Sequence, residues 1–172
     1  MPIPLLSVHP TAAQANQAAT DLLAQWLVEP DVRNVMLAAG NTPLELYRQI
    51  GLRRLALSHL KVFALDEYVG VPIEESRNCA NLIRRTAVEP WGVPENHYFT
   101  VSSSESEALE SVLEHERRIG AAGGLDVLVL GLGQNGHLGF NEPGSERDSG
   151  ARVLDLDTIS IEANRQIGRA HV

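Results

Sequence analysis

The side chains best suited to proton transfer lie in one segment, GLGQNGHLGFNEPG at 131–144. The imidazole of His137 can exchange a proton near neutral pH, and Glu142 could orient it or balance its charge. Four glycines free the backbone around this pair, at a cost in entropy that a plain connection need not meet. A nicotinamide cofactor is disfavoured, because GLGQNG is followed by a histidine and a loop rather than a helix pattern. We therefore expect acid–base chemistry here, the alternative being a glycine-rich loop with a surface histidine.

A helix start that could bind phosphate is predicted in AAGNTPLELY, residues 38–47. Gly40 and Asn41 can form a tight turn, and Thr42 can cap the helix in a capping box with Glu45. The free backbone N–H groups at such a start attract phosphate. The alternative is an ordinary capped turn between a strand and a helix, because a glycine before a helix is by itself a weak signal.

Two adjacent carboxylates, Asp66 and Glu67, follow an apolar run in ALDEYVG at 64–70. A carboxylate where a buried strand ends can act as a base on carbon if its surroundings raise its pKa. The alternative is a solvated acidic loop, which is the commoner environment of such residues. Position in the sequence does not decide between the two.

Strand and helix patterns alternate along the chain. Helical spacing predicts helices over 11–29, 43–54, 78–88 and 105–121, and short apolar runs predict strands over 35–38, 60–65, 97–101 and 125–130. This alternation predicts βαβ units and a mainly parallel sheet covered on both faces. Ligands are expected beyond the carboxyl ends of such strands, which is where the three segments above lie.

Composition narrows the class of protein. With 172 residues, 44% of them hydrophobic, the chain can bury one core, which favours a single domain. The 22 acidic residues against 14 Lys and Arg give a net charge of −8, and the basic residues form no run that could follow a phosphate backbone. We therefore do not expect nucleic acid as a partner. The N-terminus lacks the pattern of a signal peptide and the longest apolar stretch is strand-sized, so no membrane association is expected.

Cysteine and histidine usage point away from disulfides and metals. The single cysteine, Cys79, cannot form an internal disulfide, which fits a reducing cytoplasm. Four other histidines lie far apart without shared spacing, so we expect no zinc site and treat them as structural: His9, His59, His97 and His115.

In order and approximate spacing, AAGNTP, LDEYVG and GLGQNGHLGFNEPG resemble the glucosamine-6-phosphate deaminase/isomerase family over about residues 10–166. The resemblance implies a Rossmann-like three-layer α/β/α sandwich. FNEPG at 140–144 favours the deaminase branch over the related 6-phosphogluconolactonases. The implied reaction opens a 2-amino-2-deoxyhexose 6-phosphate, isomerises the aldose to a ketose and releases ammonia, with no metal or organic cofactor.

The resemblance also implies roles for single residues. Asp66 matches the carboxylate that moves a proton between C2 and C1 of the sugar. His137 matches the acid–base that opens the ring, with Glu142 supporting it. Asn135 stands where many members carry an aspartate, so in this chain the histidine relies more on Glu142. We expect Glu142→Gln to lower turnover far more than Asn135→Asp.

For the phosphate, the resemblance implies the turn Gly40-Asn41-Thr42, where the family more usually has Gly-Gly-Thr. Asn41 is therefore a departure from the pattern. Arg165 lies near the position of a phosphate-binding arginine, although the register differs by about one residue, and it is a further candidate ligand.

The resemblance implies further strands and helices beyond Val172. We expect residues 1–166 to form a truncated sugar-phosphate domain. We expect 167–172, IGRAHV, to be a non-native tail, because a DNA sequence like that of a common sequencing adapter can encode these six residues. The 172-residue chain would then have weak or no activity, and the parent could be a homo-oligomer. Two alternatives stay open, namely hydrolysis of a phosphorylated sugar lactone and a non-catalytic sugar-phosphate-binding module. The choice between gluco and galacto substrates also stays open.

Overall fold

A parallel sheet forms the centre of the molecule. The computed structural model describes residues 6–156 and residue 160. In this part of the chain the strands are β1 (Asn34–Leu37), β2 (Lys61–Ala64), β3 (Tyr98–Phe99) and β4 (Val127–Val129), in the order β3-β2-β1-β4. The last residue of β1, Leu37, is level with Ala64 of β2 and Val129 of β4. The segments after these three strands therefore leave the sheet together at one edge.

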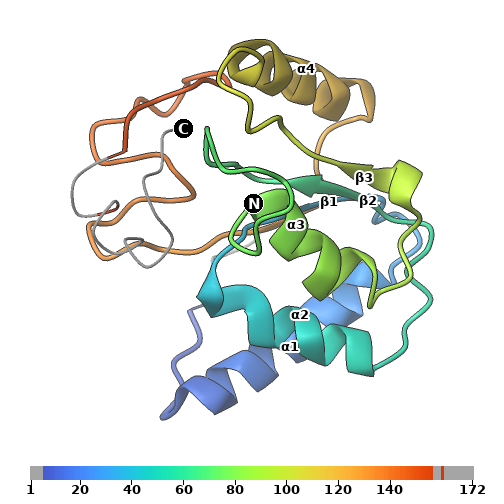
Figure 1. The fold of residues 1–172 in the computed structure, drawn as a ribbon. Coiled ribbons are helices and arrows are strands. Elements are labelled where there is room, and N and C mark those ends of the chain that lie inside the picture. Colours follow the sequence, from blue (N-terminus) through green and yellow to red (C-terminus); the bar gives the residue numbers. More distant parts are fainter. Residues whose placement is uncertain (1–5, 157–159, 161–172) are drawn as a thin grey trace.

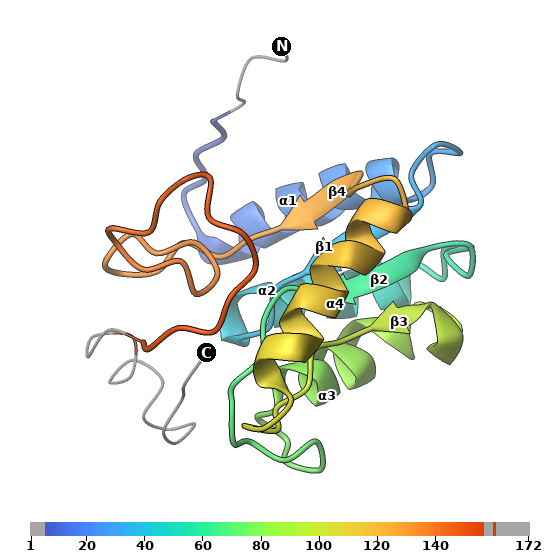
Figure 2. The same cartoon turned by 90° about the horizontal axis from the view of Figure 1, so that it is seen from above.

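Helices cover both faces of this sheet (Figures 1 and 2). On one face lie α1 (Ala12–Leu27), α2 (Asn41–Leu52) and α3 (Cys79–Ile83), which continues as a π-helical turn over Arg84–Val88. On the other face lies α4 (Ala108–Ala121), and a short 3-10 turn, Glu95–His97, precedes β3. This arrangement confirms the predicted three-layer α/β/α sandwich with a parallel sheet.

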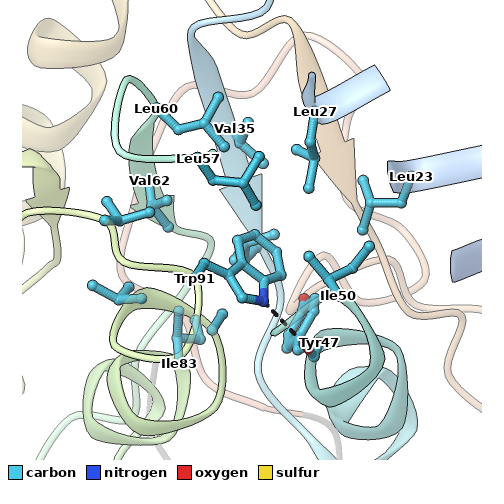
Figure 3. Packing of buried hydrophobic residues seen from close by; sticks show 14 of the residues in the cluster. Leu23, Leu27, Val35, Tyr47, Ile50, Leu57, Leu60, Val62, Ile83 and Trp91 are labelled. Atoms are coloured by element: carbon cyan, nitrogen blue, oxygen red, sulfur yellow. Dashed lines mark hydrogen bonds between the residues drawn. The ribbon is translucent and has the colours of Figure 1, made fainter. Parts of the chain in front are cut away.

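The main core lies between β1, β2 and the helices α1, α2 and α3 (Figure 3). At its centre the rings of Tyr47 and Trp91 meet edge to face, with centroids 5.7 Å apart. The Trp91 indole N–H donates to the backbone carbonyl of Tyr47 at 2.9 Å, and the Tyr47 hydroxyl donates to the carbonyl of Ala38 at 2.8 Å. These buried hydrogen bonds tie the turn after β1 to the core.

Two predicted helices match the structure closely. Thr11 caps α1, its hydroxyl accepting from the N–H of Gln14 at 3.2 Å, and Trp26 on the outer side of this helix is 47% exposed. In α4, His115 is buried, and its Nε2 donates to the carbonyl of Ala64 at 2.9 Å. His115 thus lies in the core, within the structural role that was expected of it. No helix among residues 6–156 and 160 is long and apolar enough to cross a membrane.

The predicted capping box at the start of α2 is wrong. The helix begins at Asn41, its N-cap is Gly40, and no side chain caps it. Gly40 takes φ +102°, a backbone conformation that glycine adopts at little cost, so the helix begins two residues earlier than a Thr42 cap would require. Glu45 instead accepts hydrogen bonds from Arg48 farther along the helix.

Candidate active site

The turn after β2 is built around a buried carboxylate. Glu67 is only 4% exposed, and its carboxylate accepts backbone N–H groups from Tyr68 at 2.8 Å, Cys79 at 3.0 Å and Ala80 at 2.9 Å. The last two donors lie at the start of α3, where helix N–H groups have no partner within the helix. The alternative of a solvated acidic loop is therefore wrong for Glu67.

Asp66 precedes Glu67 in this turn, and the pKa of its carboxyl is raised. Burial, and secondarily the charge of Glu67, raise the pKa of Asp66 from 3.8 to about 7. A carboxyl of this kind exchanges a proton near neutral pH, as a base on carbon requires. This condition, which the sequence left open, is met in the structure.

The loop after β4 packs against Asp66. A Cβ placed on Gly139 would lie 3.4 Å from Asp66 Oδ2 and 3.0 Å from the Leu65 side chain. Figure 2 shows this segment, in orange to red, beyond the carboxyl end of the sheet. Gly139 follows His137 by two positions, so the structure brings two of the three predicted segments into contact.

The ring of His137 lies directly over the backbone of Gly133. A methyl group on Gly133 would overlap the imidazole atoms, so no larger residue fits without moving the ring. The same two residues are joined by a hydrogen bond from the Gly133 N–H to the His137 carbonyl, 2.8 Å long, and the Gly136 N–H donates to Gly133. A specific role for Gly133 thus replaces the general one that the sequence suggested.

Asn135 and Glu142 flank the histidine. The Asn135 amide donates to Glu142 Oε2 at 2.7 Å, and its Oδ1 accepts the backbone N–H of His137 at 3.2 Å. Glu142 Oε2 lies 3.7 Å from His137 Nδ1, which is an ion-pair distance if the imidazole is protonated but longer than a hydrogen bond. The three residues predicted in this loop therefore form one cluster, in which Asn135 fixes Glu142.

Sequence reasoning missed a further partner of the histidine. The hydroxyl of Ser160 lies 3.1 Å from His137 Nδ1, and Ser160 is buried. Nδ1 is therefore in contact with an uncharged hydroxyl as well as near a carboxylate. Nothing in the sequence signals this contact, because Ser160 follows 23 residues after His137 outside the motif.

The predicted phosphate-binding turn lies beside the turn that carries Asp66, because β1 and β2 are neighbours. Gly40, Asn41 and Thr42 form the start of α2, whose free N–H groups suit an anion. The predicted ligand Arg165 and the tail 167–172 lie outside the described residues. Among residues 6–156 and 160, no group of three or more His, Cys, Asp or Glu side chains is arranged to hold a metal ion.

A cavity of about 380 Å³ opens between α4 and the segment after Gly139. Asp66 lines it at the sheet edge, together with apolar side chains such as Val112, Phe140 and Leu154. Asp66 thus faces both the loop that carries His137 and a partly open, mainly apolar cavity, an environment that contributes to the rise in its pKa.

Comparison with known proteins places the chain in a family. Residues 8–147 match the family described as glucosamine-6-phosphate isomerases/6-phosphogluconolactonase. The glucosamine-6-phosphate deaminase of Rhodococcus opacus is 37% identical over 153 residues, which are 87% of this chain and 59% of that protein. The deaminase of Bacillus pumilus is 30% identical over 155 residues, 88% of this chain and 64% of the relative.

Solved structures share the fold. A monomeric glucosamine-6-phosphate deaminase superposes with a TM-score of 0.86 at 24% identity, covering 93% of this chain and 68% of that one. The 6-phosphogluconolactonase of Trypanosoma cruzi gives 0.72 at 22% identity, covering 87% and 67%. The chain spans 59 to 64% of the length of the two deaminases matched by sequence. It belongs to the glucosamine-6-phosphate isomerase/6-phosphogluconolactonase family of enzymes.

Proposed function

We propose that this chain carries the catalytic site of an enzyme that converts glucosamine 6-phosphate and water to fructose 6-phosphate and ammonia. The observation that carries the proposal is the Asp66 carboxyl, with its pKa raised to about 7, in contact with the loop of His137. The reaction needs a group that takes a proton from one carbon and returns it to the next. A carboxyl that is half protonated near neutral pH can do both.

His137 acts first in this proposal, by opening the sugar ring. The ring oxygen gains a proton as the anomeric hydroxyl loses one, which leaves an aldehyde at C1. Glu142, 3.7 Å from Nδ1, stabilises the imidazolium form, and the Asn135 amide holds that carboxylate in place. The Ser160 hydroxyl further limits rotation of the ring.

Asp66 then moves the proton between carbons. Its carboxylate removes the proton from C2, the C–H electron pair forms the C1–C2 double bond, and the aldehyde oxygen gains a proton. The protonated Asp66 returns its proton to C1, which leaves a C2–nitrogen double bond. Addition of water at C2 and departure of ammonia complete the reaction, so no oxidant or reductant is consumed.

The phosphate of the substrate binds at the start of α2. Gly40, Asn41 and Thr42 offer backbone N–H groups there, and Asn41 adds an amide where the family pattern has glycine. We include Arg165 as a further ligand on the basis of its place in the sequence. The amino-sugar phosphate is the partner proposed here, and the single buried Cys79 fits a reducing cytoplasm as the compartment.

Hydrolysis of a 6-phosphogluconolactone is the second candidate, because the family model covers both activities and lactonases share the fold. FNEPG and the raised pKa of Asp66 favour the deaminase, since a lactonase needs no base that acts on carbon. A sugar-phosphate-binding module without turnover is the third.

One assay separates these candidates. The chain is incubated with glucosamine 6-phosphate while ammonia and fructose 6-phosphate are followed, and with 6-phosphogluconolactone while acid release is followed. Ammonia and fructose 6-phosphate in equal amounts, formed at a low rate by this chain and absent with Asp66→Asn, are expected. Lactone hydrolysis without ammonia would replace the proposal by the lactonase, and saturable binding with neither product would replace it by the module.

A further inference from the structure

We propose that Glu67 is the positioning residue of Asp66, fixing the turn that carries it and placing a buried negative charge beside it. The role goes beyond the family resemblance, which assigned nothing to Glu67. It rests on the proposed function only in so far as Asp66 is the proton carrier.

The contacts of Glu67 join two segments that are distant in sequence. One N–H donor, that of Tyr68, belongs to its own turn, and the other two, of Cys79 and Ala80, belong to the start of α3. The turn is therefore held at both ends, by β2 before Asp66 and by α3 through Glu67. Asp66 lies between these two anchors, so its backbone is held beside the loop that carries His137.

The same contacts favour the ionised form of Glu67. All three backbone partners are donors, and the Cys79 side chain supplies a further hydrogen bond. A protonated carboxyl would turn an O–H toward these donors and lose at least one of the bonds. Burial acts in the opposite direction and raises the pKa of Glu67, while the hydrogen bonds oppose this rise.

Glu67 differs from the other titratable groups near Asp66 in its effect on the pKa of that carboxyl. Among its described neighbours, Glu67 is the charge that raises the pKa of Asp66, in addition to burial. Other titratable or charged groups face Asp66 from α2, α3, α4, its own turn and the segment after the histidine loop, or line the same cavity: Tyr47, Cys79, His115, Glu116, Tyr68 and Arg152. The tyrosines and the thiol have raised pKa values and stay neutral near pH 7.

The test is a titration that needs no turnover. The side-chain carboxyl carbons of Asp66 and Glu67 are followed by ¹³C NMR from about pH 4 to about pH 9 in the unchanged chain and in Glu67→Gln. In the unchanged chain we expect Glu67 to keep its ionised shift through the midpoint of Asp66. In Glu67→Gln we expect the midpoint of Asp66 to fall by about one pH unit.

Two variants serve as controls. Glu67→Asp keeps the charge, so the midpoint of Asp66 should stay closer to that of the unchanged chain than in Glu67→Gln. Glu74→Gln removes a charge from an exposed position in the following loop, and should leave the midpoint unchanged. Amide spectra establish that each variant is folded.

Two results would overturn the proposal. One is a folded Glu67→Gln variant with an unchanged Asp66 midpoint. The other, read in the unchanged chain and so independent of whether any variant folds, is protonation of Glu67 at or above the midpoint of Asp66.

The outcome is distinguishable from failure of the proposed function. If the midpoint of Asp66 falls as expected but no ammonia is formed from glucosamine 6-phosphate, the positioning role stands and the reaction is wrong. If ammonia is formed but the midpoint does not respond to Glu67→Gln, only the positioning role is wrong. Where turnover is measured, the acidic limb of the kcat profile should move to lower pH in Glu67→Gln, whereas a purely structural defect would lower kcat at every pH.

Discussion

The turn after β2 and the loop after β4 bring polar side chains to the same edge of the sheet but hold them differently. Glu67 is buried and fixed by backbone N–H groups of two segments. His137 is held by its own loop, through Gly133 and the Asn135–Glu142 pair, and by Ser160. The carboxyl with the raised pKa, that of Asp66, thus lies in a turn that is fixed by buried backbone hydrogen bonds. The imidazole of His137 is instead oriented by contacts of its ring and backbone within and beyond its own loop.

The ionised Asp66 carboxyl should lower the free energy of unfolding, and Asp66→Asn should remove this destabilisation. The pKa of this carboxyl is raised on folding from 3.8 to about 7, so its contribution to stability is greatest below about pH 4 and declines as the pH rises to about 7. At pH 8 we expect the variant to have a free energy of unfolding higher by roughly 2 to 4 kcal/mol, and no turnover.

Urea denaturation at pH 5 and pH 8 measures this effect, which should be larger at pH 8. Asp148→Asn, at an exposed position, is the matched control and should change little. If Asp66→Asn instead lowers the free energy of unfolding at pH 8, the ionised Asp66 carboxyl does not destabilise the folded chain.

Turnover should depend on the negative charge that the loop after β4 places near His137. Glu142→Gln removes the carboxylate near His137 Nδ1, and we expect turnover to fall about a hundredfold. Asn135→Asp keeps that carboxylate and should lower turnover by less than about tenfold, although it replaces a hydrogen bond by two adjacent carboxylates. Measurement of kcat for both variants tests this expectation. Equal losses of kcat would mean that Glu142 does not support His137.

Orientation of the imidazole should depend on one glycine of this loop. Gly133→Ala forces the His137 ring aside, and we expect a loss of about 1 to 3 kcal/mol in stability together with shifted ring signals in the NMR spectrum. Gly131→Ala is the matched control, because a Cβ there meets no atom within 4 Å. If both variants leave the ring signals in place, the close approach of ring and backbone is not required.

The smallest effect is expected where the core supports the turn after β1. Tyr47→Phe removes the donor to the Ala38 carbonyl, and we expect the free energy of unfolding to fall by about 1 kcal/mol. Thermal unfolding measures the change. If Tyr47→Phe lowers the free energy of unfolding as much as Gly133→Ala does, the turn after β1 depends on its hydrogen bond as strongly as the loop after β4 depends on Gly133.

The element order and the placement of three segments at one sheet edge could be predicted, because both follow from apolar periodicity and the geometry of βαβ units. The helix start at Gly40 could not, because the pattern around Thr42 fits a capping box equally well and the outcome depends on a positive φ. The burial of Glu67 depends on its contact with α3, and the contact of Ser160 with His137 spans 23 residues. Such contacts between distant segments leave no local pattern.

The two tryptophans of the chain, one in the edge-to-face pair of the core and one at the surface, are separable optical probes. Trp91 is buried against Tyr47 beneath β1 and β2, whereas Trp26 on α1 is 47% exposed. A water-soluble quencher should therefore extinguish the fluorescence of Trp26 while leaving that of Trp91. The remaining emission reports on the layer below the sheet, so rearrangement of the loop after β4 can be told apart from unfolding of the core.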